Sequence, residues 1–498
     1  MLDSLHKTVA FSVDLFAVIA LFLFIAAVLW VIVLYIIDVN NKNQTIRRNY
    51  PVIGRFRYIF EHFGEFFRQY FFSQDREELP FNRAQRTWVY RASKNIPSNS
   101  AFGSTKDIKT PGSYYFVNCL FPTLSTDSMN TRSITFGSNI THPYSTDKLF
   151  YISAMSFGAL SSVAVEALSK GAKKAGILMN TGEGGISSYH ISGNCDLIFQ
   201  IGSAKYGVRD DSGNLSEKKI KEVANIEQVK MFEIKLSQGA KPGKGGILPA
   251  AKVTKEIAKI RCIPEGKSSI SPNRHIEIEK ESDILDLIAK IRNLTQKPVG
   301  FKAVMGSYEW LHILCQEIVE RGLDSAPDFI TIDGSEGGTG AAPTSLLDNM
   351  GISIRESLPL VVDILKKYGL KNRVKVVASG KLITSSDIVW ALCAGADIVA
   401  SARGFMFSLG CIQAMQCNKN TCPAGIATQN KKLQRGLVPK NKAERVAHYA
   451  NNIHKEISII AHSCGIKDPR EFNRSHVRIV TETTRSVGMH EVYPDVTN

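Results

Sequence analysis

The sequence has few cysteines, little negative charge and, after residue 90, no long apolar run. Nine cysteines in 498 residues are too few for the disulfide framework of a small secreted protein. Hydrophobic residues make up 44% and charged residues 21%, near the averages of globular proteins, which excludes a wholly disordered chain and a collagen-like fibre. A chain of this length can bury one large core or divide into two domains.

Acidic residues are outnumbered by basic ones, 46 Asp and Glu against 61 Lys and Arg, which gives a net charge of +15. This balance suits an anionic neighbour, whether nucleic acid, a phosphate ligand or acidic lipid. The sequence contains no recognised nucleic-acid-binding module, and basic residues cluster directly after an apolar segment near the N-terminus. We therefore expect lipid headgroups and no nucleic acid as partners of this cluster.

The long apolar run occupies residues 15–37, where every side chain is apolar or aromatic. A helix rising about 1.5 Å per residue crosses a hydrocarbon core of roughly 30 Å over this length. A cleavable signal peptide is the alternative, but its apolar region is about 7 to 15 residues long and is followed by small residues at the cleavage site. Because this run is longer and ends directly before Asp38, we predict an uncleaved single-pass anchor.

Basic residues follow this run more densely than they precede it. Lys7 precedes it, whereas the basic residues that follow closely are Lys42, Arg47, Arg48, Arg55 and Arg57. Positively charged flanks stay on the cytoplasmic side of a membrane. We therefore expect a membrane protein whose long C-terminal body is cytoplasmic.

Aromatic residues recur at helical spacing between residues 56 and 72, with charged residues among them. The apolar set is Phe56, Ile59, Phe60, Phe63, Phe66, Phe67, Tyr70 and Phe71. One interpretation is an amphipathic helix that lies in the bilayer interface, where aromatic rings are favoured. The other is a helix packed on the body of the protein, and the sequence leaves both open.

Short apolar or β-branched runs alternate with longer helical patterns, such as residues 161–175 and 284–294, in the body of the chain. This alternation predicts an α/β fold, a (β/α)8 TIM barrel. The predicted strands are residues 149–153, 177–180, 230–235, 268–271, 298–303, 328–333, 374–379 and 397–401. A doubly wound open sheet shows the same alternation and is the structural alternative.

Small or polar residues follow most of these strands, at the end of a barrel where ligands bind. They include Ala154, Met155 and Ser156, then residues 180–185, and the glycine-rich residues 334–340. Glycine allows the backbone to approach a ligand closely and to offer its N–H groups to a phosphate.

The last two strand ends combine the features of a phosphate site. Ser379 and Gly380 end one strand, and Ala402, Arg403 and Gly404 follow the next. Barrels commonly bind phosphate here, and an arginine adds a charge-assisted contact. A ligand with one terminal phosphate, such as flavin mononucleotide (FMN), fits this arrangement. No G-x-G-x-x-G motif follows a strand, so we expect no resident nicotinamide-binding domain.

Cys411, Cys417 and Cys422 form a C-x5-C-x4-C pattern, with Pro423 after the last. In a reducing compartment this density indicates metal or iron–sulfur ligation rather than disulfides. Zinc needs a fourth ligand that the segment does not offer, so a 3Fe–4S cluster on three thiolates fits the count better. Three buried apolar thiols are the alternative. We expect core positions for the other cysteines, which are Cys119, Cys195, Cys262, Cys315, Cys393 and Cys464.

Ordered motifs between residues 152 and 429 resemble the FMN-binding, iron–sulfur synthase domain of glutamate synthase. They are ISAMSFGALS (152–161), NTGEGG (180–185), KLSQGAKPGKGG (235–246), DGSEGGTGAAP (333–343) and GCIQAMQCNKNTCPAGIATQ (410–429). The last motif is similar to the 3Fe–4S motif of the family, with identical spacing. The chain looks most like the short, stand-alone, membrane-anchored proteins that resemble glutamate synthase.

The resemblance implies a barrel that holds FMN, with the cluster passing electrons to it. In glutamate synthase, reduced FMN delivers hydride to the 2-iminoglutarate formed from 2-oxoglutarate and ammonia. By motif, Lys235 and Lys241 match paired lysines, Arg261 matches an arginine of the 2-oxoglutarate site, and Glu183 matches the glutamate at the ammonia entrance. These residue types suit those roles, because cations orient a dicarboxylate and a carboxylate suits an incoming ammonium.

The strand ends and the resemblance together give the residues expected to bind FMN. They are Ala154, Met155, Ser156, Lys302, Gly334, Gly337, Gly338, Ser379, Gly380, Ala402 and Arg403. The expected metal ligands are the three clustered cysteines.

Two positions depart from the family pattern KPGEGGQ, because this chain has Lys244 and Ile247 in place of Glu and Gln. Replacing an amide by an aliphatic side chain removes donors that would hold a keto acid. The substrate is therefore not expected to be 2-oxoglutarate itself. The residues before 150 leave no room for a glutaminase domain, so free ammonia, an amine or a partner's product would supply the nitrogen.

The leading prediction is a membrane-anchored oxidoreductase acting on CH–NH2 groups, which forms an amino acid from an oxo or imino acid. An amine–glutamate synthase type of transferase and a non-catalytic electron-relay subunit are the alternatives. The expected partners are the small substrate, an electron donor such as ferredoxin or a reductase subunit, membrane lipid and a second copy of the chain in a homo-oligomer.

The expected boundaries place the anchor before one barrel domain. The segments are residues 1–14 (N-terminal), 15–37 (transmembrane), 38–90 (interfacial or linker), 91–148 (lead-in), 149–430 (barrel with the cysteine motif) and 431–498 (C-terminal helix and tail). The helical pattern of the last segment ends near Gly465, and residues 466–498 resemble a polar tail.

Overall fold

The computed structural model describes residues 2–496 of the chain. The chain divides into two compact units at Ala84 and Gln85.

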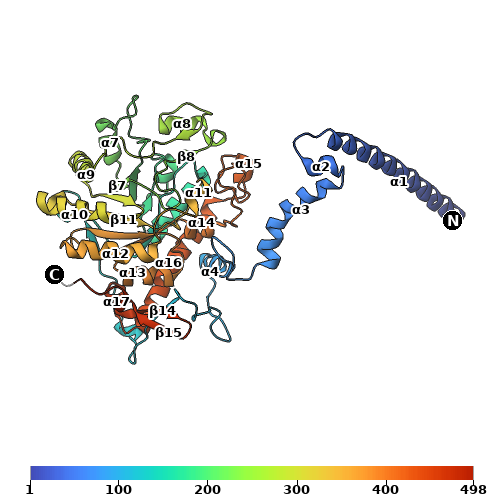
Figure 1. The fold of residues 1–498 in the computed structure, drawn as a ribbon. Helices are drawn as coiled ribbons and strands as arrows, with labels where there is room; N and C mark the ends of the chain where they lie inside the picture. The colour runs from blue at the N-terminus through green and yellow to red at the C-terminus, as the bar shows by residue number, and fades with distance from the viewer. Residues whose placement is uncertain (1, 497–498) are drawn as a thin grey trace. The chain divides into compact units, whose positions relative to one another are not determined.

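The first unit is helical (Figure 1). It consists of α1 (Leu2–Val39), α2 (Thr45–Asn49), α3 (Gly54–Phe67) and a turn of π-helix, η1 (Arg68–Phe72). Within the described residues, α1 is the one helix long and apolar enough to cross a membrane, and it contains the apolar run at residues 15–37. The aromatic segment forms α3 and η1.

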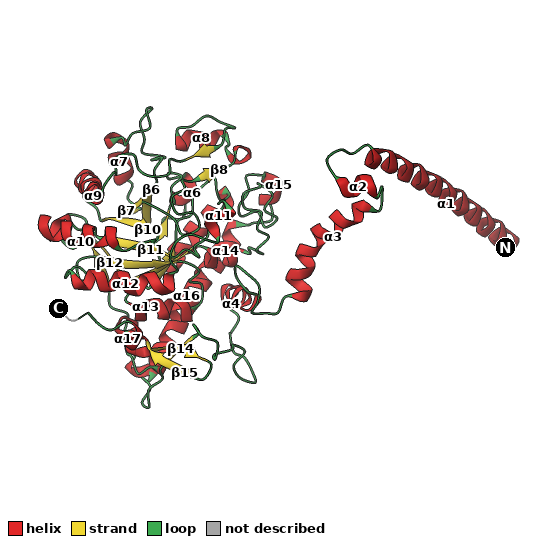
Figure 2. Ribbon diagram, viewed as in Figure 1, coloured by secondary structure: helices red, strands yellow, loops and turns green. Residues whose placement is uncertain are grey.

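Eight parallel strands close into a barrel in the second unit, with helices around it (Figure 2). The strands are β4 (Phe150–Ile152), β5 (Met179–Asn180), β6 (Leu197–Ile201), β7 (Val229–Lys235), β10 (Val299–Ala303), β11 (Phe329–Asp333), β12 (Lys375–Ser379) and β13 (Ile398–Ser401). The first and last strands pair in parallel, with Val399 opposite Phe150, and so close the barrel. This confirms the predicted TIM barrel and excludes the open sheet.

Burial on both faces explains why these strands are continuous apolar runs. All residues of β10, β11 and β13 are buried. Helices α5 (Ser162–Ala175), α7 (Glu217–Ala224), α9 (Glu281–Thr295), α12 (Ile354–Lys367) and α13 (Ser385–Ala394) pack on the strands. The other helices between β4 and residue 434 are α6 (Ser188–Ile191), α8 (Lys255–Arg261), α10 (Glu309–Arg321), α11 (Thr344–Leu347), α14 (Arg403–Leu409) and α15 (Lys431–Gln434). Local signals set their ends: in α5 the Ser161 side chain accepts a hydrogen bond from the Ala164 N–H, and Gly176 terminates the helix at φ +65°.

One predicted barrel strand was wrong, and one strand was missed. Residues 268–271 belong to a two-stranded antiparallel hairpin of β8 (Ile247–Leu248) and β9 (Ser269–Ile270), within the long segment between β7 and β10. The missing barrel strand is β6, where Gln200 interrupts the apolar run. Inside the barrel this amide is buried and hydrogen-bonded, so the strand loses nothing by carrying it.

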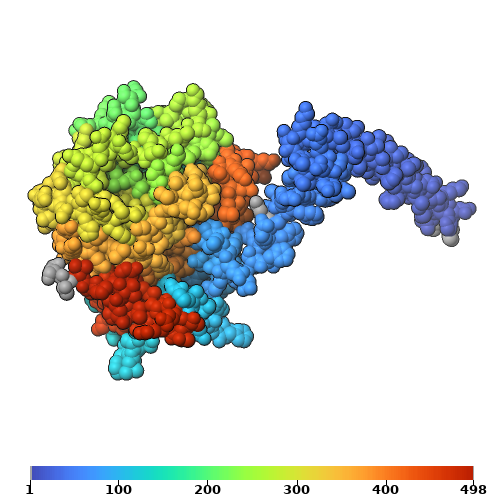
Figure 3. Space-filling view, viewed as in Figure 1, coloured from blue at the N-terminus to red at the C-terminus, as the bar shows by residue number. Residues whose placement is uncertain are grey.

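The C-terminal segment is folded, contrary to the polar tail expected after residue 465. Strand β14 (Val477–Glu482) pairs antiparallel with β15 (Arg485–Gly488) and with β1 (Tyr114–Phe116), so the red C-terminal strands lie beside the cyan lead-in segment in Figure 3. Helix α17 (Met489–Val492) follows β15. The few apolar residues of the segment suffice because a distant part of the chain supplies the pairing strand.

Two further helices and a hairpin complete the second unit. Helix α16 (Pro439–Ser463) packs along α5, α13 and α14. Helix α4 (Arg83–Ser93) and the hairpin of β2 (Ile134–Phe136) and β3 (Tyr144–Thr146) precede the barrel.

Candidate active site

The carboxyl ends of all eight barrel strands meet at one mouth, because the strands are parallel. Lys235 is the last residue of β7, and its Nζ donates a hydrogen bond to Oε1 of Glu183 at 2.8 Å. Glu183 lies in the loop after β5. Their side chains are only 11% and 17% exposed. The structure thus brings two of the predicted catalytic residues into contact in a largely desolvated place.

Two glycines, Gly202 and Gly246, pack closely against the Glu183 carboxylate. A Cβ added at Gly202 would lie 2.6 Å from its Oε2, and one added at Gly246 would lie 2.5 Å from its Oε1. Neither position tolerates a side chain without displacing the carboxylate. Gly202 follows β6 and Gly246 precedes β8, so the loops of two elements close on Glu183.

Lys241 lies beside this pair and is 3% exposed. Its Nζ donates to the Ala341 carbonyl oxygen at 3.2 Å. Burial and the nearby Lys235 charge lower the pKa of Lys241 to about 8, although Glu183 opposes the shift. Burial alone would raise the pKa of the Glu183 carboxyl, but Lys235, Lys241 and Arg261 outweigh it, so this pKa lies below its ordinary value. Near neutral pH the site therefore holds one carboxylate among several cations.

Arg261, the last residue of α8, is buried and only weakly hydrogen-bonded. Its terminal nitrogens donate to Ser269 Oγ and to the Phe157 carbonyl oxygen, each at 3.4 Å, and its Nε has no partner. The guanidinium lies over the Tyr206 ring, 5.1 Å from the centroid. A buried cation with spare donors is suited to an anionic ligand.

The ends of β11 and β12 approach each other too closely for side chains. A Cβ added at Gly334 would lie 2.7 Å from the Ile354 nitrogen, and one at Gly380 would lie 3.0 Å from the Gly334 nitrogen. Gly380 also has φ +132°, which side-chain-bearing residues rarely adopt. A Cβ at Gly337 would lie 2.9 Å from Asp333 Oδ1. Glycine thus lets the two strand ends pack closely, while the N–H groups of Gly334 and Gly337 donate to the Ser379 and Gly334 carbonyl oxygens, each at 2.8 Å. Binding of an FMN phosphate here stays a prediction.

Asp333 ties the predicted flavin residues together. Its carboxylate accepts hydrogen bonds from Ser379 Oγ at 2.9 Å and from the Gly239 N–H at 2.9 Å, and it pairs with Lys302 at 3.3 Å. Gln238 adds a second link, because it accepts from Lys235 Nζ and donates to the Gly338 carbonyl oxygen. The residues predicted to bind the substrate and those predicted to bind FMN are thereby joined.

The segment Ala154, Met155 and Ser156 packs against the loop after β5. A Cβ at Gly182 would lie 2.7 Å from the Ser156 nitrogen. His190 holds Met155 from behind: because its Nδ1 accepts from the Ser187 N–H, its Nε2–H donates to the Met155 carbonyl oxygen at 2.8 Å. Burial lowers the pKa of His190 to about 4, so this histidine is neutral.

Arg403 faces the cysteine loop. One terminal nitrogen donates to the Thr339 carbonyl oxygen, and the other lies 3.9 Å from the Cys417 sulfur. A Cβ at Gly338 would lie 2.7 Å from Arg403 Nε, so Gly338 and Arg403 lie side by side. Ala402 precedes α14 as its N-cap residue. The contact of Arg403 with a phosphate stays a prediction.

The three clustered cysteines lie in the loop after α14, but they do not form a ligand set as they stand. The described residues contain no group of three His, Cys, Asp or Glu side chains placed to hold a metal ion. Burial raises the pKa of the Cys411 thiol to about 11. Lys252, whose Nζ donates to the Cys417 carbonyl oxygen at 3.1 Å, places a buried cation next to this loop. The thiol chemistry suits iron, but the arrangement of the sulfurs does not show a ligated cluster.

The other cysteines are mostly in the core, as expected. Cys195, Cys315, Cys393 and Cys464 are buried. The prediction was wrong for Cys262, which is exposed at the left-handed end of α8, and Cys119 is only half-buried.

A buried polar network inside the barrel was missed from the sequence. Glu233 accepts hydrogen bonds from Asn180 at 2.8 Å, Gln200 at 2.7 Å and Thr331 at 2.6 Å. These residues are at most 2% exposed and come from four strands. Glu233 lies two residues before Lys235 on β7, so the network forms the floor of the mouth. A polar residue inside an apolar strand run was the available signal.

Ile247 and Lys244 lie in the segment that covers the mouth. Ile247 begins β8, directly after the Gly246 that contacts Glu183, and is half-buried. Lys244 is also half-buried, and its N–H donates to the Lys241 carbonyl oxygen at 3.2 Å. The two departures from the family pattern therefore lie close to the predicted catalytic residues.

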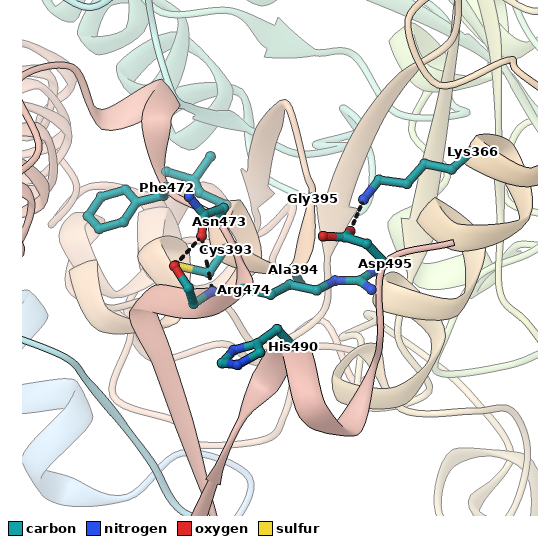
Figure 4. Close-up of a pocket in the computed structure, with 11 residues that line it drawn as sticks. Lys366, Cys393, Ala394, Gly395, Phe472, Asn473, Arg474, His490 and Asp495 are labelled. Atoms are coloured by element: carbon teal, nitrogen blue, oxygen red, sulfur yellow. Dashed lines mark hydrogen bonds and ion pairs between the residues drawn. The ribbon is translucent and has the colours of Figure 1, made fainter. Parts of the chain in front are cut away.

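A cavity of about 460 Å³ lies elsewhere, near the ends of α12 and α13 that lead into β12 and β13 (Figure 4). It is therefore at the amino ends of the barrel strands. Lys366 pairs with Asp495 at 2.6 Å, and Arg474 pairs with Asp363 at 2.7 Å. The Lys366, Arg474 and Asp495 side chains that line the cavity are thus already paired. None of the predicted site residues lines this cavity.

The conserved region of glutamate synthase matches residues 115–467 of this chain. The glutamate synthase large subunit-like protein YerD of Bacillus subtilis (strain 168) is 43% identical over 483 residues, 89% of this chain and 91% of that protein. The chain belongs to the glutamate synthase family. The recognition of this family from its motifs is confirmed, and the chain is a glutamate-synthase-like oxidoreductase.

Other members of the glutamate synthase family are matched over part of their length. The archaeal-type glutamate synthase (NADPH) of Thermotoga sp. (strain RQ2) is 34% identical over 340 residues, 68% of this chain and 62% of that protein. The glutamate synthase (NADPH) large chain of Bacillus subtilis (strain 168) is 30% identical over 326 residues, 64% of this chain and 20% of that protein. Among solved structures, and outside this family, the chain is similar to the flavin-binding domain of baker's yeast flavocytochrome b2, with 15% identity, a TM-score of 0.45 and a match that covers 83% of this chain and 85% of that chain.

Proposed function

We propose that this glutamate-synthase-like protein is a membrane-anchored FMN oxidoreductase that converts an anionic oxo or imino acid to an amino acid. The observation that carries this proposal is the group of Lys235, Lys241 and Arg261 around Glu183, next to the side-chain-free ends of β11 and β12. Three cations at one desolvated mouth favour a substrate with carboxylate groups.

FMN is the cofactor that fits the mouth. Its phosphate would lie near the side-chain-free strand ends at Gly334, Gly337 and Gly380, and Lys302 would face the ring system. When bound, FMN would supply the hydride.

The residues of this chain would bind and orient the acid. Lys241 and Arg261 would hold the carboxylate of the acid. Both are buried. Lys241 donates one hydrogen bond, to the Ala341 carbonyl oxygen, and Arg261 has an Nε without a partner. Glu183, kept ionised by its neighbours, would accept hydrogen bonds from an ammonium or amine and take its proton. Ile247 and Lys244 stand where the family pattern has Gln and Glu, so we propose an acid that resembles 2-oxoglutarate but is not identical to it.

We also propose that Cys411, Cys417 and Cys422 hold an iron–sulfur cluster. No step of the reaction is assigned to this cluster. The motif spacing and the cations Arg403 and Lys252 beside the loop support it. The test is iron and acid-labile sulfide in anaerobically purified protein, with a Cys417→Ser variant that should lose both and keep FMN. Iron-free protein with full FMN content would remove the cluster.

Helix α1 is proposed as the anchor, with the second unit in the cytoplasm, because α1 is long and apolar and basic residues follow it. The electron donor would be a ferredoxin or a reductase subunit, and the nitrogen would come from ammonia or an amine.

The main test is FMN content followed by activity. We expect about one FMN per chain, the usual stoichiometry of such a site, and amino-acid formation from oxo acids, ammonia and dithionite under anaerobic conditions. Lys241→Ala should lower kcat/KM strongly, mainly by raising KM, and keep FMN, whereas Lys432→Ala, at an exposed position of α15, should change neither kcat/KM nor FMN content. A folded protein that takes up no FMN would contradict the proposal.

The second candidate is transfer between glutamate and an amine without net reduction. Anaerobic turnover of glutamate plus amine without dithionite would favour it over the oxidoreductase. A third outcome, loss of a cellular phenotype in Cys417→Ala but not in Lys241→Ala, would favour an electron-relay subunit.

A further inference from the structure

We propose that α3 and η1 form a second membrane contact, a helix that lies in the headgroup region of an anionic bilayer with its aromatic face toward the acyl chains. This rests on the proposed anchoring through α1, which places the first unit at a membrane. It goes beyond that anchoring because it assigns a lipid-binding surface to a segment outside the span.

The aromatic face of this helix is exposed within the first unit. Phe60 is 68% exposed, Phe71 is 74% exposed, and the remaining members Phe56, Ile59, Phe63, Phe66, Phe67 and Tyr70 are between 41% and 53% exposed. These residues recur three and four positions apart and so form one stripe along α3 and η1. Exposed aromatic stripes of this size mark an interaction surface.

Charge specifies the partner. Residues 40–72 contain six Lys or Arg and two Glu. Of the basic residues, Arg57 pairs with Glu61 on the flank of the stripe, 2.9 Å apart and mostly exposed. An aromatic helix face flanked by charged residues, in a segment whose net charge is positive, is a composition that binds at a bilayer interface. Anionic lipid headgroups would complement the net positive charge.

A buried ion pair fixes how this helix leaves the end of α1. Asp38 is fully buried, and its two oxygens accept hydrogen bonds from Nε and Nη2 of Arg55, both at 2.7 Å. The Val52 N–H also donates to Asp38, at 3.0 Å. The last turn of α1 is thereby joined to the first turn of α3, so α3 begins at the depth where the apolar run ends.

Close packing of α2 on α3 stiffens the same turn. A Cβ added at Gly54 would lie 2.7 Å from the Ile46 carbonyl oxygen, so only glycine fits there. The Arg47 guanidinium lies over the Tyr58 ring, 5.1 Å from its centroid. Tyr58 therefore faces α2, away from the aromatic stripe. The connection between α1 and α3, residues 38–55, is therefore compact, and we call it the elbow. It leads from the α1 span directly into the proposed interfacial helix.

The test is fluorescence quenching by brominated lipids in the full-length protein, reconstituted in nanodiscs. The variants are Phe63→Trp, on the aromatic stripe, and Tyr58→Trp, its matched control facing α2, each made with Trp30→Phe to silence α1. The discs contain phosphatidylcholine alone or with phosphatidylglycerol, and bromine is placed either near the headgroup or deep in the acyl chains.

We expect Phe63→Trp to be quenched several-fold more than Tyr58→Trp by shallow bromine, weakly by deep bromine, and more strongly with phosphatidylglycerol. Equal quenching of the two variants, as for a helix packed on the barrel, would overturn the proposal. Quenching that is unchanged by phosphatidylglycerol would overturn its electrostatic part. Protein that retains Trp30 reports α1 separately: absence of its quenching by deep bromine would contradict the anchor itself.

Discussion

At the scale of single residues, Lys241 gives the site its pH dependence. Burial lowers the pKa of its ammonium from 10.5 to about 8. The ammonium is therefore charged below that pH and loses its proton as the pH rises through about 8. Binding of an anionic acid that depends on this charge should weaken over the same range, so we expect kcat/KM to fall above pH 8, mainly through KM.

The control is Lys241→Arg, because a guanidinium stays protonated to a pH above about 12. If Lys241 is the titrating group, the variant should lose the alkaline fall in kcat/KM while it keeps some activity. A fall that persists unchanged in Lys241→Arg would assign the pH dependence to another group.

Gly246 tests how precisely Glu183 must be held. Its replacement by Ala would place a Cβ 2.5 Å from Glu183 Oε1, so the carboxylate must move away from Lys235. Misplacement by about 1 Å can cost roughly 100-fold in rate. We expect Gly246→Ala to reduce kcat/KM strongly with unchanged FMN content, whereas Gly436→Ala, with open space around it, should be neutral. Equal activity of the two variants would show that Glu183 needs no such support.

The sequence predicted some of these residues and missed others for a physical reason. Glu183, Lys235 and Lys241 stand in glycine-rich motifs after strands, where a polar side chain must be at the mouth. Glu233 and Gln200 interrupt apolar strands, and their partners come from other strands. Only closure of the barrel turns these interruptions into a satisfied network.

At the scale of elements, the alternation of apolar runs with helical patterns predicted a barrel. It did not predict correctly which apolar runs become barrel strands. Seven of the eight predicted strand runs overlap barrel strands. Residues 268–271 were predicted as a barrel strand. They do contain a strand, β9, but it pairs with β8 outside the barrel. Local pattern reports strand propensity, whereas the partner is decided by tertiary contacts.

The elbow of the first unit gives a prediction at this scale. Asp38→Asn removes the buried charge that binds Arg55 through two hydrogen bonds, so α3 should lose its fixed connection to α1. We expect faster amide hydrogen exchange across residues 45–72 of the protein in detergent. Arg57→Gln breaks an exposed pair on the same helix and should leave exchange there nearly unchanged, since exposed pairs contribute little. Similar exchange in both variants would mean that Asp38 does not hold the elbow.

At the scale of the whole molecule, the two units carry separate signals in the sequence. Motifs in the barrel identify the family over residues 115–467, and none of them extends into the first unit. The helices of the first unit are predicted only from the length of the apolar run and from the spacing of the aromatic residues. The folded C-terminal strands escaped prediction because their pairing with β1 joins segments more than 350 residues apart, for which no local pattern exists.

Truncation should separate the two membrane contacts. Residues 40–498 lack α1 but keep the aromatic helix, so we expect them to bind anionic vesicles and to be released by high salt, because screening weakens the attraction of the basic residues. Residues 85–498 lack both contacts and should stay in solution with FMN bound, since they form a compact unit of their own. Flotation with vesicles, with and without salt, measures both. Salt-resistant binding of residues 40–498 would show that the aromatic face alone supplies the attachment and that the basic residues do not, and binding of residues 85–498 would move the lipid contact to the barrel unit.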